Sequence, residues 1–368
     1  MFSFGLALLV SLLVSLGVLR AVRWHARYTL DHIGDEARKL HAHAVPRIGG
    51  LGVFIAVTLG AAGIWVKDRN VGAQALLLIA CSSIAFLGGL TEDLTRRVAP
   101  RWRMVLMAAT CVLGWWLLDV RIVRIDIPAI DTLFAFQPFA IGLTLLALLT
   151  ITNAINLIDG LNGLAGVVCA VMFAGLGLVG LKVGDSFVVS CSLLMAGSIC
   201  GFLFWNYPHG RIFLGDGGAY FLGFMLGAMS ILLVARNAQV SAWFPVLLLA
   251  YPLFEVAFSI WRRKFVKGAH PGMPDAAHLH HLIYRRVVRW AIGTTVPERR
   301  TWRNAMTSPY LWVLSSLAVG PAVVFYDNGP MLMGFSVLFV ASYLWLYARI
   351  VHMRVPRWLV LKDKRRDD

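Results

Sequence analysis

The sequence predicts an all-α polytopic membrane protein with about eleven transmembrane helices. Of its 368 residues, 59% are hydrophobic and only 14% are charged, and the mean hydropathy is +0.73. A soluble fold cannot bury that much apolar surface. The apolar residues also occur in blocks, such as 2–19 and 71–90, that are long enough to cross most or all of a hydrocarbon core of about 30 Å.

A hydropathy window of about 19 residues locates the individual spans. They cover approximately residues 2–20, 48–66, 72–90, 104–118, 134–152, 161–181, 186–205, 217–235, 240–260, 308–326 and 330–350. With the N-terminus placed outside, Lys and Arg residues divide 28 to 6 between the inside and outside segments. Because basic residues favour the cytoplasmic side, we expect the N-terminus outside and the C-terminus in the cytoplasm.

The spans leave little room for a separate soluble domain. The longest segment between them, 261–307, has only 47 residues, too few for an independent catalytic unit. We therefore expect one integral-membrane catalytic domain over residues 1–368, with 261–307 as its longest cytoplasmic loop and 351–368 as a basic cytoplasmic tail. The net charge of +15 fits this topology and contact with anionic membrane lipids, so we expect no nucleic-acid partner.

Two charged clusters lie at the ends of the first three spans. Lys39, His41 and Arg47 precede a pair of glycines in the segment RKLHAHAVPRIGG, an arrangement that suits a phosphate. An ordinary basic flank is the alternative. Glu92 and Asp93 end the third span in GLTEDL, where adjacent carboxylates indicate either a functional or cation-bound pair or a solvated helix end.

Two further clusters combine polar side chains with glycines. Asn153, Asn156 and Asp159 recur every third residue in NAINLIDGLNGLAG, which places them on one helix face at the head of an apolar helix. This stripe either lines a cavity or forms an interhelical hydrogen-bond seam. Asp216 lies between glycines in FLGDGGAYFLGF; the glycines predict room for a metal ion and a ligand, and a helix N-cap is the alternative.

The densest group of histidines lies in the segment HPGMPDAAHLHH. His278, His280 and His281 fall within four residues, without an HExxH pattern, and favour contact with a phosphate over a transition metal. Glu255 lies more than one turn inside the ninth span. A carboxylate at that depth indicates a function, or a structural ion pair with a residue such as Arg262.

In this order, the five segments resemble the polyprenyl-phosphate N-acetylhexosamine-1-phosphate transferase family over roughly residues 20–290. That family includes the peptidoglycan translocase, but the HLHH form is more similar to the O-antigen type. The chain departs from the family pattern twice. Glu92 and Asp93 replace a pair of aspartates, and Ala219 replaces the serine of GDxGS.

The resemblance implies transfer of a sugar 1-phosphate, an N-acetylhexosamine 1-phosphate, from a UDP-sugar to undecaprenyl phosphate at the cytoplasmic membrane face. UMP is released, Mg²⁺ is the cofactor, and the product initiates a cell-surface glycan such as the O-antigen of lipopolysaccharide. We then expect a multi-pass protein of the bacterial inner membrane, in contact with membrane lipids and able to form a homodimer. Which UDP-sugar is used stays open.

The resemblance also assigns roles to the singled-out residues. Asp216 is expected to be the main Mg²⁺ ligand, with Asp159 contributing. Asp93, beside Glu92, is expected to orient or deprotonate the lipid phosphate, and a covalent aspartyl-phosphate is an open alternative. The remaining members are expected to bind substrate: Lys39, His41, Asn153, Asn156, His278, His280 and His281.

Another class of membrane protein, a transporter or flippase, is the competing interpretation. It would place charged residues near the middle of several spans and could show an inverted repeat. Beyond Glu255 the sequence shows neither feature, and a purely structural scaffold leaves the acidic and histidine clusters unexplained.

Overall fold

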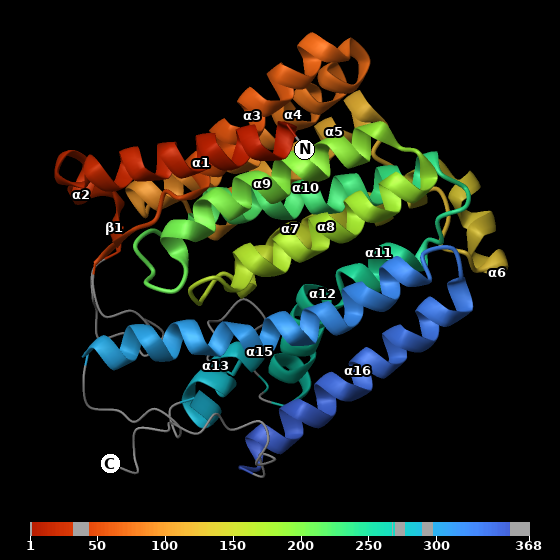
Figure 1. The fold of residues 1–368 in the computed structure, drawn as a ribbon. Helices are drawn as coiled ribbons and strands as arrows, with labels where there is room; N and C mark the ends of the chain where they lie inside the picture. The colour runs from red at the N-terminus through yellow and green to blue at the C-terminus, as the bar shows by residue number, and fades with distance from the viewer. Residues whose placement is uncertain (1, 32–43, 267, 269–276, 289–296, 354–368) are drawn as a thin grey trace.

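The computed structural model describes residues 2–31, 44–266, 268, 277–288 and 297–353 (Figure 1). Within these residues the chain is almost entirely helical. The two strands β1 (Leu30–Asp31) and β2 (Val45–Pro46) have two residues each and pair antiparallel. The predicted all-α class is therefore confirmed.

Nine helices of the described part of the chain are long and apolar enough to cross a membrane. Each corresponds to one predicted span, and the protein is a multi-pass membrane protein. They are α1 (Phe2–Arg20), α3 (Gly50–Lys67), α4 (Arg69–Thr95), α7 (Gln137–Ile158), α8 (Leu164–Val183), α9 (Ser186–Asn206), α10 (Gly215–Arg236), α15 (Pro297–Val324) and α16 (Gly329–Val351).

The other two predicted spans have a different form. The span 104–118 is a helix, α5 (Pro100–Leu118), but its first turn carries arginines that lower its mean hydropathy, and it is not among the nine. The span 240–260 is broken into α11 (Trp243–Leu248) and α12 (Ala250–Trp261). Pro252 explains the break, because a proline ring clashes with the carbonyl four residues earlier. The number of crossings and their orientation stay predictions.

Short elements connect the long helices. The predicted loop 261–307 contains several of them as well as the first turns of α15, which begins before the predicted span 308–326. The short elements are α2 (Val22–Thr29), α6 (Pro128–Asp131), the 3-10 helix η1 (Thr132–Ala135), the π-helix η2 (Arg262–Val266), α13 (Leu279–Leu282) and the π-helix η3 (Ile283–Val288).

Helix α10 lies at the centre of the bundle, with α1, α3 and α4 on one side of it and the α15–α16 pair on the other (Figure 1). In the apolar stretch of α10, 94% of the residues are buried, and the helix packs against α4, α7 and α3. Its first turn makes backbone contact with its neighbours. A Cβ added to Gly89 of α4 would overlap the backbone of Gly217, and one added to Gly50 of α3 would overlap Gly218. The end of α4 therefore lies directly against the start of α10.

The glycines beside Asp216 have a packing role. Gly217 and Gly218 let three helix backbones approach closely. Side chains from other helices surround Asp216, whose own side chain is 13% exposed, and form the site described next. The room for a metal ion and a ligand that the sequence predicts beside Asp216 stays a prediction.

Candidate functional site

Asp93, at the end of α4, caps the beginning of α10. Its Oδ1 accepts a hydrogen bond from the backbone N–H of Asp216, and its Oδ2 accepts one from the backbone N–H of Gly217, both at 3.0 Å. The side chain is 1% exposed. The first N–H groups of a helix have no partner within the helix, and a carboxylate there also meets the positive end of the helix dipole. Asp93 therefore fixes the position of Asp216.

The side chain of Asp216 receives donors from two other helices. Arg103 of α5 donates from Nη1 to Oδ2 at 2.6 Å, and Asn156 of α7 donates from Nδ2 to Oδ1 at 3.0 Å. The guanidinium of Arg47 lies 3.6 Å from Asp216 Oδ1 and also 3.6 Å from Asp93 Oδ1. Asp216 is 13% exposed and both arginines are more exposed than it is, so the cations form the open side of the cluster.

Backbone hydrogen bonds hold Arg47 in this position. The chain before α3 runs beside the chain before α10: Phe213 N–H donates to the carbonyl of Pro46, and Gly49 N–H donates to the carbonyl of Phe213, both at 2.8 Å. Gly215 has a φ of +79° and packs on the backbone of Arg47, where a side chain would not fit. These contacts fix the segment that carries Arg47 against the segment that leads to Asp216.

Asp159 follows directly after the last residue of α7. Burial, and to a lesser extent the neighbouring carboxylate of Asp216, raise the pKa of Asp159 to about 7, against the opposing effect of the Arg47 guanidinium. The carboxyl groups of Asp159 and Asp216 are therefore close enough to repel each other when both are ionised. A cation between them would relieve their repulsion.

The histidines pack as a stack beside this cluster. The rings of His278 and His280 are parallel to within 4°, with centroids 5.5 Å apart, and the rings of His280 and His281 are 4.2 Å apart. A Cβ added to Gly160 would lie 3.2 Å from Nε2 of His280, so this ring lies against the residue after Asp159. Burial and the neighbouring imidazoles lower the pKa of His280 well below its usual range. His280 is therefore neutral at physiological pH.

A buried amide network holds the loop between α7 and α8. Gly163, with φ +73°, donates its N–H to Oδ1 of Asn206 at 2.6 Å. Asn162 donates its backbone N–H to Oδ1 of Asn304 at 2.7 Å and its side-chain amide to the carbonyl of Pro208 at 3.0 Å. These contacts tie the loop after Asp159 to the end of α9 and to α15.

The structure therefore brings together most of the predicted site residues that it describes. Asp93, Asp159, Asp216, Asn156 and His280 meet at one end of the bundle, as the clustering of polar residues predicts. Lys39 and His41 lie outside the described residues.

Two other predicted site residues, Glu92 and Asn153, make no hydrogen bond with this group of carboxylates in the described structure. Glu92 accepts a hydrogen bond from the backbone N–H of Val98 at 2.8 Å and so stabilises the turn after α4. Asn153 lies in α7, partly exposed, and its side chain makes no hydrogen bond within the described residues. The stripe from Asn153 to Asp159 ends α7 and does not begin the next helix as expected, because the chain turns at residues 159–163.

Arg103 is the site residue that the sequence did not reveal. Its sequence signal was an arginine immediately before the predicted span 104–118, ten residues after Asp93. That arginine was counted only as a topology signal. Asn162 and Asn304 also escaped notice, since a single asparagine near a helix end has no distinguishing pattern.

A divalent cation would find few protein ligands here. Among the described residues, no three His, Cys, Asp or Glu side chains are grouped closely enough to hold a metal ion. Mg²⁺ at phosphate-transfer sites, however, needs only one or two carboxylates because substrate phosphates and water supply the rest. The mutual repulsion of Asp159 and Asp216 fits a site of that kind.

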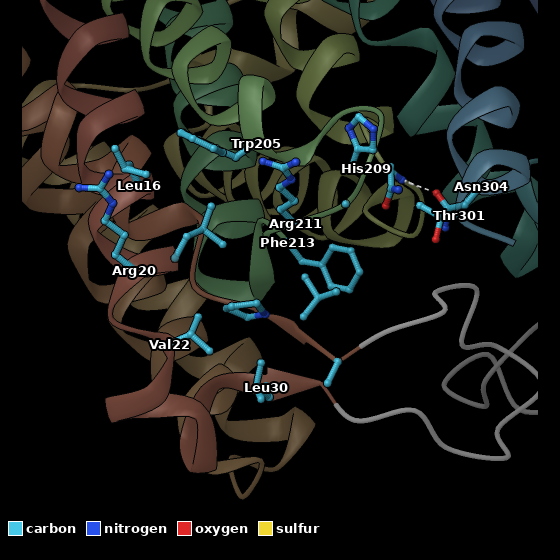
Figure 2. A pocket seen from close by; sticks show the side chains of 16 residues that line it. Leu16, Arg20, Val22, Leu30, Trp205, His209, Arg211, Phe213, Thr301 and Asn304 are labelled. Carbon is cyan, nitrogen blue, oxygen red and sulfur yellow. Dashed lines mark hydrogen bonds between the residues drawn. The ribbon is translucent and has the colours of Figure 1, made fainter. Parts of the chain in front are cut away.

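A cavity of about 470 Å³ is lined by Pro46, the residue before Arg47, and by part of the chain after α9; none of the carboxylates or arginines of the site lines it (Figure 2). It shares Asn162 with the α7–α8 loop and Phe213 with the segment that leads to Asp216. Its wall combines cations, amides and aromatic rings from α1, from the end of α9 and the chain after it, and from α15. Those side chains include Arg20, Trp205, His209, Arg211, Phe213 and Asn304. The volume falls within the usual range for small-molecule sites.

Comparison with known proteins adds independent information. Residues 75–234 match the profile described as Glycosyl transferase family 4. The chain is 31% identical over 248 residues to the Bacillus subtilis protein named "Probable undecaprenyl-phosphate N-acetylglucosaminyl 1-phosphate transferase", covering 66% of this chain and 67% of the relative.

Two other relatives have similar names. The chain is 30% identical over 259 residues to an undecaprenyl-phosphate alpha-N-acetylglucosaminyl 1-phosphate transferase of Thermotoga maritima, covering 69% of this chain and 73% of the relative. It is 30% identical over 335 residues to a decaprenyl-phosphate N-acetylglucosaminephosphotransferase of Mycolicibacterium smegmatis, covering 82% and 78%. The matches thus extend beyond the segment that the family profile covers.

Proposed function

We propose that this chain, which belongs to the polyprenyl-phosphate N-acetylhexosamine-1-phosphate transferase family, transfers N-acetylglucosamine 1-phosphate from UDP-N-acetylglucosamine to undecaprenyl phosphate. The relatives' names supply the sugar and the lipid. The observation that carries the proposal is the meeting of Asp93, Asp159 and Asp216 with Arg47 and Arg103 at one end of a membrane bundle. One substrate is soluble and the other is anchored in lipid, so the reaction needs a site at the membrane surface.

The reaction joins two anions. A phosphate oxygen of the lipid attacks the β-phosphorus of the UDP-sugar, a new O–P bond forms, and the bond between that phosphorus and the bridging oxygen breaks to release UMP. The second pKa of a phosphate monoester is about 6, so the nucleophile is largely ionised at neutral pH. The protein's main task is therefore to offset charge repulsion and to align the reactants, which Arg47 and Arg103 are placed to do.

Mg²⁺ is the cofactor we propose for this site. Asp216 and Asp159 would hold it, and the bound ion would neutralise charge on the diphosphate. Asp93 contributes by fixing the first turn of α10, and thereby Asp216, through its two backbone hydrogen bonds. Its direct action on the lipid phosphate stays a prediction.

The cellular setting is also part of the proposal. The cytoplasmic face of the bacterial inner membrane would supply both UDP-sugar and lipid carrier, and the product would begin a cell-surface glycan. The cavity lined by Pro46 and Phe213 offers space for part of a nucleotide sugar. A homodimer and the O-antigen pathway stay predictions from the sequence.

A direct assay tests the function. Purified protein in nanodiscs is incubated with undecaprenyl phosphate, Mg²⁺ and a panel of radiolabelled UDP-sugars, and labelled lipid and UMP are quantified. We expect equal amounts of both products, with UDP-N-acetylglucosamine the best donor. Movement of lipid without UMP release would instead support a flippase and overturn the proposal.

The metal role is tested in the same assay. Asp216→Asn and, separately, EDTA should abolish transfer, because the neutral amide is a weaker ligand for Mg²⁺. Asp185→Asn is the matched control, since Asp185 also lies at a helix start and accepts a hydrogen bond from Val188 N–H. Full activity after either treatment would remove the metal from the mechanism.

A further inference from the structure

The carboxylate of Glu255 in α12 is fully buried and has three polar partners. Oε2 accepts a hydrogen bond from the hydroxyl of Tyr343 in α16 at 2.6 Å. Oε1 accepts one from the backbone N–H of Leu279 at 3.2 Å and lies 3.0 Å from Nδ1 of His278. Both Glu255 and Tyr343 are 0% exposed. The proposed reaction has so far given neither residue a role.

The contact with Glu255 fixes the orientation of His278. Because both carboxylate oxygens already accept hydrogen bonds, the imidazole donates from Nδ1, which leaves Nε2 for another partner. A carboxylate behind a functional histidine fixes the plane of its ring and raises its basicity. The sequence suggested Arg262 as a partner of Glu255, but the structure pairs Glu255 with His278 and Tyr343.

The ring of His278 packs against the rest of the histidine stack. This ring is parallel to that of His280, which in turn lies against Gly160, next to Asp159. His280 is 1% exposed and its Nδ1 has no hydrogen-bond partner among the described residues. Packing rather than side-chain hydrogen bonding therefore holds His280 in place, between the rings of its neighbours His278 and His281.

Helix α16 makes a second contact with the same segment. The hydroxyl of Tyr347 donates to the carbonyl of Ala277 at 3.3 Å and accepts from Nη1 of Arg262 at 3.0 Å. The last membrane helix thus holds the residue before His278 as well as the carboxylate behind it.

We propose that Glu255 and Tyr343 are positioning residues that hold the His278–His280 stack against the Asp159 loop, so that the imidazoles meet the substrate phosphates. This inference rests on the proposed function, in which the histidines contact those phosphates. It gives the final membrane helix, outside the segment that matches the family profile, a defined part in the site.

Steady-state kinetics of Y343F and E255Q test the proposal. Y343F removes one hydroxyl and keeps the ring, and E255Q keeps the shape but removes the charge. The matched control is Y251F. Tyr251 is as buried as Tyr343, it lies in α12 one turn before Glu255, and its hydroxyl has no hydrogen-bond partner among the described residues. Thermal unfolding of each variant is recorded in parallel.

We expect KM for at least one of the two phosphate-bearing substrates to rise about 10-fold in Y343F and at least as much in E255Q, as is typical when a supporting hydrogen bond behind a functional histidine is lost. The double variant should be no worse than E255Q, since both changes interrupt one chain of contacts. Y251F should match the wild type.

A purely structural role gives a different result. Partial unfolding reduces the amount of active enzyme and leaves KM unchanged, so unchanged KM values in Y343F and E255Q overturn the positioning role, whatever their unfolding temperatures. Transfer by the wild type and Y251F shows that the proposed function survives that outcome. If neither of them transfers the sugar phosphate, both the function and the positioning role are overturned.

Discussion

Replacing Asp93 by asparagine tests whether a carboxylate from α4 holds the start of α10. The change keeps the size of the side chain but leaves only one oxygen to accept from the N–H groups of Asp216 and Gly217, so one N–H loses its acceptor or both donate to the same oxygen. A buried N–H group left without an acceptor costs about 1–3 kcal/mol. The expected loss is therefore about 1–3 kcal/mol.

The same substitution should lower the transfer rate. The first turn of α10 carries Asp216, and a shift of about 1 Å in a catalytic group can cost on the order of 100-fold in rate. Glu92→Gln is the matched comparison, since Gln keeps an acceptor for the N–H of Val98 in a partly exposed turn. Its effect on stability should stay within about 0.5 kcal/mol.

Two measurements separate these expectations. Unfolding in nanodiscs, followed by tryptophan fluorescence, should show a lower midpoint for Asp93→Asn than for Glu92→Gln, and initial rates at saturating Mg²⁺ should fall in the same order. An Asp93→Asn protein as stable as the wild type would refute the capping argument. If it were also inactive, the chemical role suggested by the sequence would be the better explanation.

Two other predictions concern packing and pH. Gly89→Ala should destabilise the protein by about 1–3 kcal/mol, because the new Cβ overlaps the backbone of Gly217, whereas Gly142→Ala, with open space around it, should not; equal unfolding midpoints would contradict the close approach of α4 and α10. Asp159 has a raised pKa of about 7, so the folded state holds its proton more tightly than the unfolded state and stability falls as pH rises from about 4 to 7. In EDTA, Asp159→Asn should therefore raise the unfolding midpoint at pH 8 and leave it nearly unchanged at pH 4; an unchanged midpoint at both pH values would show that Asp159 titrates normally.

Hydropathy predicted the long helices well because span length and apolar content are local properties of the chain. Hydropathy failed at helix boundaries, where single polar residues or prolines decide the structure. The spacing predicted Asn153 and Asn156 at the head of the following apolar helix, yet they lie in the last turns of α7, where Asn156 donates to Asp216. Pro252 breaks the predicted ninth span, although a proline changes a window average very little.

The composition of the site was predicted better than its internal contacts. Sequence clusters identified Asp93, Asp159 and Asp216 because carboxylates at membrane boundaries are unusual. Which donors each oxygen meets depends on the helix packing. The pairing of Arg103 with Asp216, for example, joins residues 113 positions apart, and nothing in the local sequence distinguishes that arginine from a topology signal.

The charge balance of the described site shows why the protein side chains alone are a poor receptor for its proposed substrates. Asp93, Asp159 and Asp216 place three carboxyl groups in the site, and Arg47 and Arg103 supply two positive charges. His280 is neutral and therefore donates or accepts hydrogen bonds without adding charge. Two phosphate-bearing substrates entering this environment would repel each other and the carboxylates. Additional positive charge is needed, and a divalent cation near Asp159 and Asp216 would supply it where the repulsion is greatest.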